Sequence, residues 1–189
     1  MGRFGSFFTG IIQAMNSYFT KLNIEIDRLD IDSMKKTPIR SFRNYTAYYD
    51  ISENDRYEYL YEMFSPFKPV NVVWCNLPSA RPHIDHDNVI TGINHYYDTV
   101  DAKTIFYEPK ENAVPFCGEG ETLPNYYKPE DIVEQCRFCA GLNEVYLLDI
   151  SKIHALDFPI KGTRKMMKWQ FKISYDEIYQ ELKSKNIIL

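Results

Sequence analysis

The chain has 189 residues and a formal net charge of −4; 44% of its residues are hydrophobic and 25% are charged. This length favours a single domain with a sizeable core, and the negative charge argues against general nucleic-acid binding, which needs a basic face. Four cysteines are too few for a disulfide scaffold, and no apolar run reaches about 18 residues. We therefore expect reduced thiols, a cytoplasmic location and no membrane segment. The aromatic content, 15%, favours β structure and is compatible with a homodimer.

Residues 1–69 are expected to form a support region of helices and short strands beside the core. Apolar spacing, strand composition and a capping-box-like pair at Ser52 and Asp55 define its elements. The expected elements are a helix over Phe7–Leu22, a strand or irregular arm over Ile24–Ile31, a strand over Thr46–Tyr49 and a helix from Ser52 to about Phe64.

Residues 70–174 carry most of the predicted strands. Alternating or continuous apolar residues predict strands over Asn71–Cys75, Val89–Asp98, Lys103–Tyr107, Glu144–Ile150 and Arg164–Ile173. In the last strand, alternation puts Met167, Trp169, Phe171 and Ile173 on one side and Arg164, Met166, Lys168 and Gln170 on the other, the side of the expected cavity. Ser174 with Glu177 predicts a capped helix within 175–189. Short alternating strands with flanking helices indicate a mainly β two-sheet barrel or jelly roll rather than βαβ units.

The segment 108–143 is long and rich in proline and glycine, as functional loops often are. We interpret it as a lid-like insertion over the mouth of the barrel that shapes substrate choice. Within it, Pro129–Cys139 has proline in its first turn and Gly141 beyond its end, which predicts a short helix.

The sequence Arg81–Asp87 is the densest cluster of potential metal ligands in the chain. On an extended strand, residues two apart point to the same side, so His83 and Asp85 can reach one point. An imidazole and a carboxylate are two of the three ligands of the facial triad that binds non-haem Fe(II), and His154 is the candidate for the third. His86 cannot share a face with Asp85 on a regular strand, so we favour His83. A solvated polar loop is the simpler alternative.

Four features follow one another in chain order, and the order resembles a known family. They are Pro82-His83-Ile84-Asp85, the pair Ile93-Asn94 before Thr104-Ile105-Phe106-Tyr107, the run Leu147-Leu148-Asp149 leading to His154, and Arg164 ten residues later. Together they resemble the Fe(II)- and 2-oxoglutarate-dependent oxygenases with a cupin-like double-stranded β-helix core, in particular small phage and marine-bacterial members. The resemblance covers approximately residues 71–174.

The resemblance implies a role for each of these residues. His83, Asp85 and His154 would bind Fe(II), and Arg164 would bind the far carboxylate of 2-oxoglutarate with its planar guanidinium. Asn94 or Tyr96 would add a hydrogen bond to the cosubstrate. The implied partners are 2-oxoglutarate, O2 and an unidentified substrate, and the implied activity is hydroxylation of a protein side chain or a small amino-acid-like molecule.

Two other functions remain open from the sequence. A cupin-like metal barrel, such as an isomerase or epimerase, would use the same ligands without needing Arg164. A non-catalytic jelly roll, such as a phage structural module, would leave the histidines as solvated loop tips. Cys136 and Cys139 could be half of a zinc site or simply packing neighbours.

Overall fold

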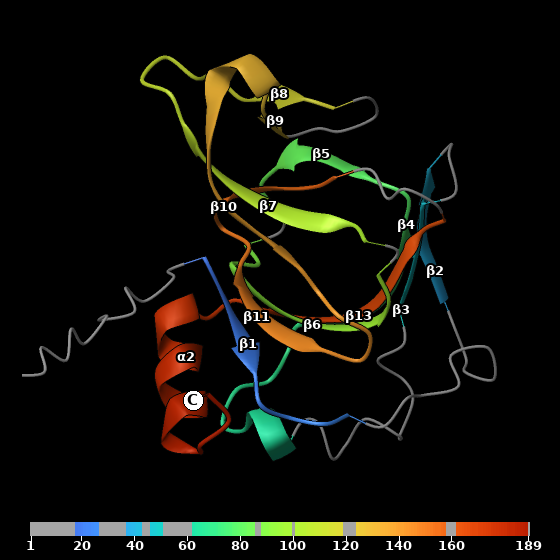
Figure 1. Ribbon diagram of the computed structural model, residues 1–189, viewed down its shortest axis with the longest axis vertical. Helices are drawn as coiled ribbons and strands as arrows, with labels where there is room; N and C mark the ends of the chain where they lie inside the picture. The colour runs from blue at the N-terminus through green and yellow to red at the C-terminus, as the bar shows by residue number, and fades with distance from the viewer. Residues whose placement is uncertain are drawn as a thin grey trace, which may run out of the picture.

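The computed structural model describes residues 18–26, 37–42, 46–50, 62–85, 88–99, 101–118, 124–157 and 162–188. These residues form two antiparallel sheets, which face each other in Figure 1 with helix α2 beside the lower one. The seven-stranded sheet has the order β1-β11-β6-β13-β4-β3-β2, and the six-stranded sheet has the order β10-β7-β12-β5-β9-β8. The mainly β fold class with a flanking helix is therefore confirmed.

The strands have the following bounds. In the seven-stranded sheet they are β1 (Phe19–Leu22), β2 (Thr37–Phe42), β3 (Thr46–Asp50), β4 (Asn71–Leu77), β6 (Thr91–Asp98), β11 (Val145–Asp149) and β13 (Arg164–Phe171). In the six-stranded sheet they are β5 (Ala80–His83), β7 (Lys103–Pro109), β8 (Phe116–Cys117), β9 (Pro124–Tyr126), β10 (Ile132–Cys139) and β12 (Ile153–Leu156). Helix α2 spans Tyr175–Ser184, and the 3-10 turn η3 spans Pro129–Asp131.

From β4 onward the chain passes repeatedly between the two sheets. Strands β4, β6, β11 and β13 lie together in the seven-stranded sheet, whereas β5, β7, β10 and β12 lie together in the six-stranded sheet. This winding brings the ends of β5 and β12, which are far apart in sequence, into the same sheet as direct neighbours.

Strand β13 illustrates how sequence alternation divides the core. Met167, Trp169 and Phe171 belong to a cluster shared with α2 on one side of the seven-stranded sheet. Met166 belongs to a second cluster, which combines side chains of both sheets and therefore lies between them. The alternation predicted for this strand is confirmed, because successive residues of a strand point to opposite faces. Arg164 shares the face of Met166, so it points into the space between the sheets.

Helix α2 begins as the sequence predicts. The Ser174 hydroxyl accepts a hydrogen bond from the backbone of Glu177, and the Glu177 carboxylate accepts one from the Ser174 backbone. This reciprocal capping box satisfies two backbone donors that the first turn leaves without partners. Four residues of the helix are then buried against the sheet: Tyr175, Ile178, Tyr179 and Leu182.

Two expected helices are wrong where the structure describes them. Phe19–Leu22 is strand β1, which pairs with β11, and Phe19 packs against Phe106 and Phe138. Within Pro129–Cys139 only η3 is helical, and the remainder is β10, paired with β7 through a bulge. In both cases pairing with a neighbouring strand outweighs a weak helical spacing.

Several other expectations fall wholly or partly outside the described residues. Residues 62–64 are helical, in agreement with a helix that ends near Phe64, but residues 51–61 and 1–17 are not described. The same holds for residues 27–36, so the arm expected over Ile24–Ile31 is seen only at its start, where residues 24–26 form neither helix nor strand.

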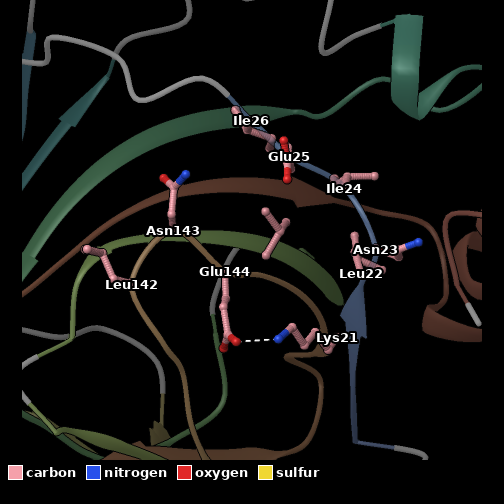
Figure 2. A pocket seen from close by; sticks show the side chains of 10 residues that line it. Lys21, Leu22, Asn23, Ile24, Glu25, Ile26, Leu142, Asn143 and Glu144 are labelled. Atoms are coloured by element: carbon pink, nitrogen blue, oxygen red, sulfur yellow. Dashed lines mark hydrogen bonds and ion pairs between the residues drawn. The ribbon is translucent and has the colours of Figure 1, made fainter.

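A surface pocket of about 560 Å³ lies where β1 and the following residues pass the turn before β11. Figure 2 shows Lys21 ion-paired with Glu144 and the side chains of Glu25 and Asn143 at its wall. Glu144 is further bound by the backbone of Gly141 and the hydroxyl of Tyr146. Its charge is thus already balanced by protein groups.

Among the described residues, no helix is long and apolar enough to cross a membrane.

Candidate metal centre

Two histidines lie side by side on the two central strands of the six-stranded sheet. His83 is the last residue of β5, and His154 is the second residue of β12. The antiparallel register places them directly opposite each other, with ring centroids 4.5 Å apart. Directly paired residues of antiparallel strands point to the same face, so the two imidazoles necessarily lie side by side.

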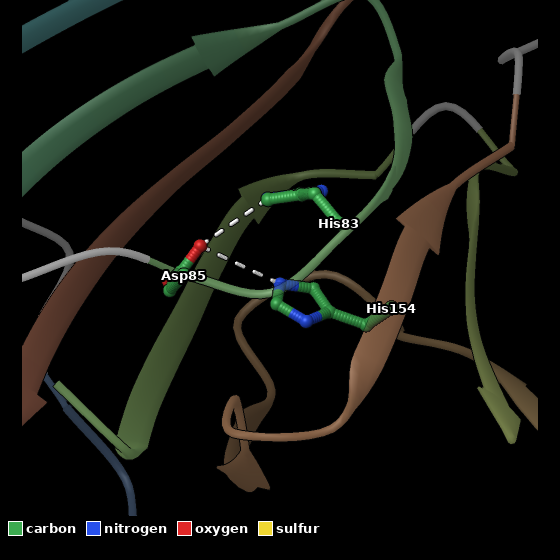
Figure 3. Close-up of side chains that lie close together, drawn as sticks. All are labelled: His83, Asp85 and His154. Atoms are coloured by element: carbon green, nitrogen blue, oxygen red, sulfur yellow. Dashed lines mark ion pairs between the residues drawn. The ribbon is translucent and has the colours of Figure 1, made fainter. Parts of the chain in front are cut away.

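Asp85 completes a three-residue cluster with the two histidines. Its Oδ1 lies 3.2 Å from His83 Nε2 and 3.7 Å from His154 Nε2. Figure 3 shows the carboxylate turned toward both imidazoles. One ligand atom from each residue lies within 4.8 Å of the others, and no other such group occurs in the described part of the chain. The three predicted metal ligands therefore converge. Residues 86–87, which contain the alternative His86, are not described.

The imidazoles are oriented by backbone carbonyls. His83 Nδ1 lies 2.7 Å from the carbonyl oxygen of Arg81, and His154 Nδ1 lies 3.0 Å from that of Lys152. Because a carbonyl oxygen only accepts, each Nδ1 carries the hydrogen and donates it. Each Nε2, which is the atom facing Asp85, is then available to a metal. Metal-binding histidines are commonly held in this way through the second nitrogen.

The charges of the cluster favour a cation between the three side chains. Burial lowers the pKa of His154 to about 4, so its Nε2 presents a lone pair at neutral pH. Burial alone would raise the pKa of Asp85, but the Lys168 ammonium holds it well below its ordinary value. A lone pair thus faces a carboxylate oxygen inside the protein. A metal ion between them would convert this repulsion into coordination.

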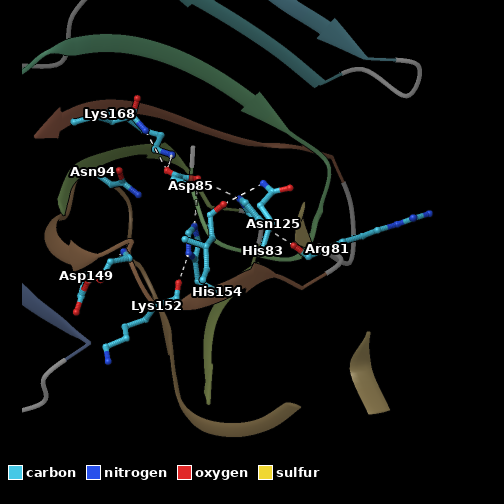
Figure 4. A network of polar contacts seen from close by, with 12 residues as sticks. Arg81, His83, Asp85, Asn94, Asn125, Asp149, Lys152, His154 and Lys168 are labelled. Atoms are coloured by element: carbon cyan, nitrogen blue, oxygen red, sulfur yellow. Dashed lines mark hydrogen bonds and ion pairs between the residues drawn. The ribbon is translucent and has the colours of Figure 1, made fainter. Parts of the chain in front are cut away.

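Two further polar side chains, which the motif search did not single out, hold the other oxygen of Asp85. Lys168 Nζ and Gln170 Nε2 each lie 3.1 Å from Oδ2 and donate to it. Figure 4 shows Lys168 reaching Asp85 from β13, on the side away from the two histidines. Sequence alternation had placed Lys168 on the inward face of β13, but nothing in the sequence paired it with Asp85.

Asp85 lies just beyond the last residue of β5, and Asn125 holds this segment in place. The backbone N–H of Ile84 donates to the Asn125 carbonyl at 3.0 Å, and Asn125 Nδ2 donates to the Ile84 carbonyl at 3.0 Å. The Asp85 N–H lies 3.4 Å from the Ile150 carbonyl. These bonds keep the chain extended for two residues past the end of β5, which is the conformation that lets His83 and Asp85 point to one side.

Arg164 is a buried cation whose contacts in the described part of the chain are all with neutral groups. Only 2% of its surface is exposed. Its guanidinium donates to the Thr104 hydroxyl at 2.6 Å and to the Ala102 carbonyl, and it lies 5.0 Å from the ring centre of Tyr96. All these partners are neutral, and no carboxylate among the described residues pairs with it. A buried charge of this kind is costly unless an anion balances it.

Asn94 and Tyr96 occupy different positions relative to the site. Asn94 lines the cavity and faces Lys168 across the β6–β13 pair. Its Nδ2 donates to the Tyr96 hydroxyl at 3.2 Å. Tyr96 is fully buried beneath Arg164 and is not part of the cavity wall. The geometry thus gives Asn94 access to a ligand, while Tyr96 supports the guanidinium.

A cavity of about 40 Å³ connects the histidines with Arg164. Its wall combines polar and apolar side chains: Leu77, Ala80, His83, Asn94, Thr104, Leu148, Ile150, His154, Ala155, Leu156, Arg164, Met166 and Lys168. Two buried polar atoms of this wall, Asn94 Oδ1 and Arg164 Nε, have no hydrogen-bond partner among the described residues. Unsatisfied buried groups of this kind are rare, and they call for a ligand or ordered water.

The cysteines form no comparable group. None of the four forms a disulfide, and Cys136 and Cys139 both lie on β10, where residues three apart point to opposite faces. A zinc site built on this pair is therefore not supported. His95 is fully buried and donates from Nε2 to the Asn143 side chain at 2.9 Å, which is a structural role.

No protein-family model and no curated protein matches this chain.

Proposed function

We propose that this protein is an Fe(II)- and 2-oxoglutarate-dependent dioxygenase built on a double-stranded β-helix. The observation that carries the proposal is one cavity that is lined both by the two histidines of the His-Asp-His cluster and by a buried arginine with no acidic partner among the described residues. The cluster suits a metal that keeps open coordination positions, and the arginine suits a carboxylate.

The strand arrangement supports the fold in this proposal. Eight strands, β4 to β7 and β10 to β13, divide equally between two antiparallel sheets that enclose a common core. Two facing four-stranded groups formed by a chain that passes back and forth are what a jelly roll requires. The site lies between these two groups, where a barrel of this kind opens.

In this proposal the chain's own residues bind and orient the reactants. His83, Asp85 and His154 hold Fe(II), and Arg164 with Thr104 holds the distal carboxylate of 2-oxoglutarate. When bound, the metal would supply the activation of O2 by which one substrate C–H becomes C–OH while 2-oxoglutarate becomes succinate and CO2. The apolar part of the wall, Leu148, Leu156 and Met166, excludes water from the reacting centre.

The cavity must widen to admit 2-oxoglutarate. Its volume of about 40 Å³ holds a few water molecules, whereas pockets for drug-sized ligands are typically about 300–1,000 Å³. Met166 is the adaptable side chain of the wall because it is unbranched and has three rotatable bonds. We expect it to move when the cosubstrate enters beside Arg164.

The alternative functions predict different roles for Arg164 and different exposure for the histidines. A cupin-like isomerase or epimerase would not need a buried arginine in the metal cavity. A structural jelly roll would leave the ligands solvated, but the side chains of His83, Asp85 and His154 are only 18%, 11% and 11% exposed. Both observations favour the oxygenase.

The test is formation of succinate from 2-oxoglutarate by the full chain supplied with Fe(II) and ascorbate, in the wild type and in His154→Ala. Turnover in the wild type that is lost in the variant would support the metal and the cosubstrate together. Fe(II) binding with no 2-oxoglutarate binding would favour the cupin-like alternative, and no metal binding would favour the structural module.

A further inference from the structure

The two oxygens of Asp85 have different environments. Oδ1 faces His83 and His154, whereas Oδ2 accepts hydrogen bonds from Lys168 and Gln170, each at 3.1 Å. A carboxylate oxygen has two lone pairs in the plane of the group. Two donors therefore saturate Oδ2, and only Oδ1 remains for a metal.

Both donors come from β13, and strand geometry brings them together. Lys168 and Gln170 are two residues apart, so their side chains leave the same face of the strand. The Lys168 side chain is only 11% exposed, as is that of Asp85, which makes this a mostly buried ion pair. Such a pair resists rearrangement, because separating it would leave two buried charges without partners.

We propose that Lys168 and Gln170 are positioning residues that restrict Asp85 to coordination through one oxygen. This inference rests on the metal centre of the proposed function but requires nothing of 2-oxoglutarate. A carboxylate that bound through both oxygens would occupy an additional position on the metal. Because Lys168 and Gln170 hold Oδ2 away from the metal, that coordination position stays open for an incoming ligand.

The charge of Lys168 makes this interpretation specific. An ammonium that shares a carboxylate with a divalent cation repels that cation, so Lys168 weakens metal binding electrostatically. The position of Lys168 therefore favours coordination of Asp85 through one oxygen and lowers the affinity of the site for the metal. Removing the ammonium should give equal or tighter metal binding, together with a metal that has fewer open positions.

The experiment counts the water molecules on bound Mn(II) in the full chain, from the broadening of its EPR lines in 17O-enriched water. Lys168→Met should lose about one water ligand, because Oδ2 turns to the metal, and its Kd for Mn(II) should be unchanged or lower. Lys168→Arg keeps a charged donor and should restore the wild-type count. The matched control is Lys165→Met, an exposed lysine of the same strand.

Gln170→Leu provides a second variant in case Lys168→Met does not fold, and it should change the count in the same direction. An unchanged water count in every folded variant, or weaker Mn(II) binding by Lys168→Met, would overturn the inference while leaving the metal centre intact. A wild-type chain that binds no Mn(II) would overturn the metal centre itself, so the two failures are distinguishable.

Discussion

His83 and His154 are directly paired across β5 and β12, and their rings, 4.5 Å apart, both present Nε2 to the same oxygen of Asp85. This pairing links the fold to the site, because strand register alone brings together two residues that are distant in sequence. A shift of one residue in this register would turn one imidazole to the opposite face.

The first prediction concerns His154→Ala, which removes one of the three ligands. We expect the Kd for Fe(II) or Mn(II) to rise at least about 100-fold, since changes to the residues behind metal ligands alone cost about 10–100-fold. Isothermal titration under anaerobic conditions measures this. Lys152→Ala is the control, because it keeps the backbone carbonyl that accepts the hydrogen bond from His154. An equal loss of metal affinity in both variants would show that a change in the loop, and not the missing imidazole, weakens binding.

The second prediction separates stability from cosubstrate binding at Arg164. Arg164→Met leaves the Ala102 carbonyl and the Thr104 hydroxyl without their donor but also removes a buried charge that no described residue balances. These effects oppose each other, so the free energy of unfolding without ligand should change by less than about 2 kcal/mol.

Addition of 2-oxoglutarate should distinguish this variant from the wild type. At 100 times its Kd, a ligand stabilises the folded state by about 2.7 kcal/mol, which a thermal melt of the metal-loaded chain detects. Arg164→Met should lose this stabilisation and keep its Mn(II) affinity. If the variant retained the shift, the distal carboxylate would have to bind elsewhere in the cavity.

The convergence of His83, Asp85 and His154 could be predicted from sequence because the chemistry of metal binding is concentrated in a few residue types. His83 and Asp85 are two residues apart, and the third ligand had to be another histidine. The inward direction of Arg164 followed from the alternation of Arg164 to Ile173. Lys168 and Gln170 were on the same predicted face, but their contact with Asp85 depends on how β13 lies against the end of β5. Pairing between distant segments is not encoded in local spacing.

The two wrong helix predictions also arise because local spacing does not encode pairing with distant strands. Phe19–Leu22 and Ile132–Cys139 carry apolar residues at spacings that both a helix and a strand can bury. Local propensity is a weak guide in such segments, and the available edge strand decides the outcome. By contrast, Ser174 and Glu177 determine the start of α2 through contacts within one turn, and that prediction succeeded.

The third prediction tests how the chain beyond β5 is held. Asn125→Ala removes the side-chain hydrogen bond to the Ile84 carbonyl but keeps the backbone bond from Ile84 to residue 125. We expect the Kd for Mn(II) to rise about tenfold, the lower end of the range for groups behind metal ligands. Asn23→Ala, at an exposed position just after β1, is the control for loss of an amide. Unchanged affinity would mean that the backbone bonds alone position Asp85.

The fourth prediction concerns pH and His95, which lies outside the metal centre. Burial lowers the pKa of His95 below its ordinary value of 6.5. As pH falls through 6.5, the unfolded chain takes up a proton that the folded chain does not, so the free energy of unfolding decreases. The loss begins near pH 6.5 and continues down to the lower pKa of the folded state. Urea unfolding at pH 7.5 and 5.5 should therefore show lower stability at the acidic pH.

His95→Gln is the variant that tests this assignment. Its Nε2 can keep the hydrogen bond to Asn143, but it has no group that titrates in this range. The stability difference between pH 7.5 and 5.5 should shrink in this variant without vanishing, because the lowered pKa of His154 acts in the same direction. An identical pH dependence in the variant and the wild type would show that His95 takes up its proton equally well in the folded state. Burial of His95 would then not disfavour the protonated imidazole.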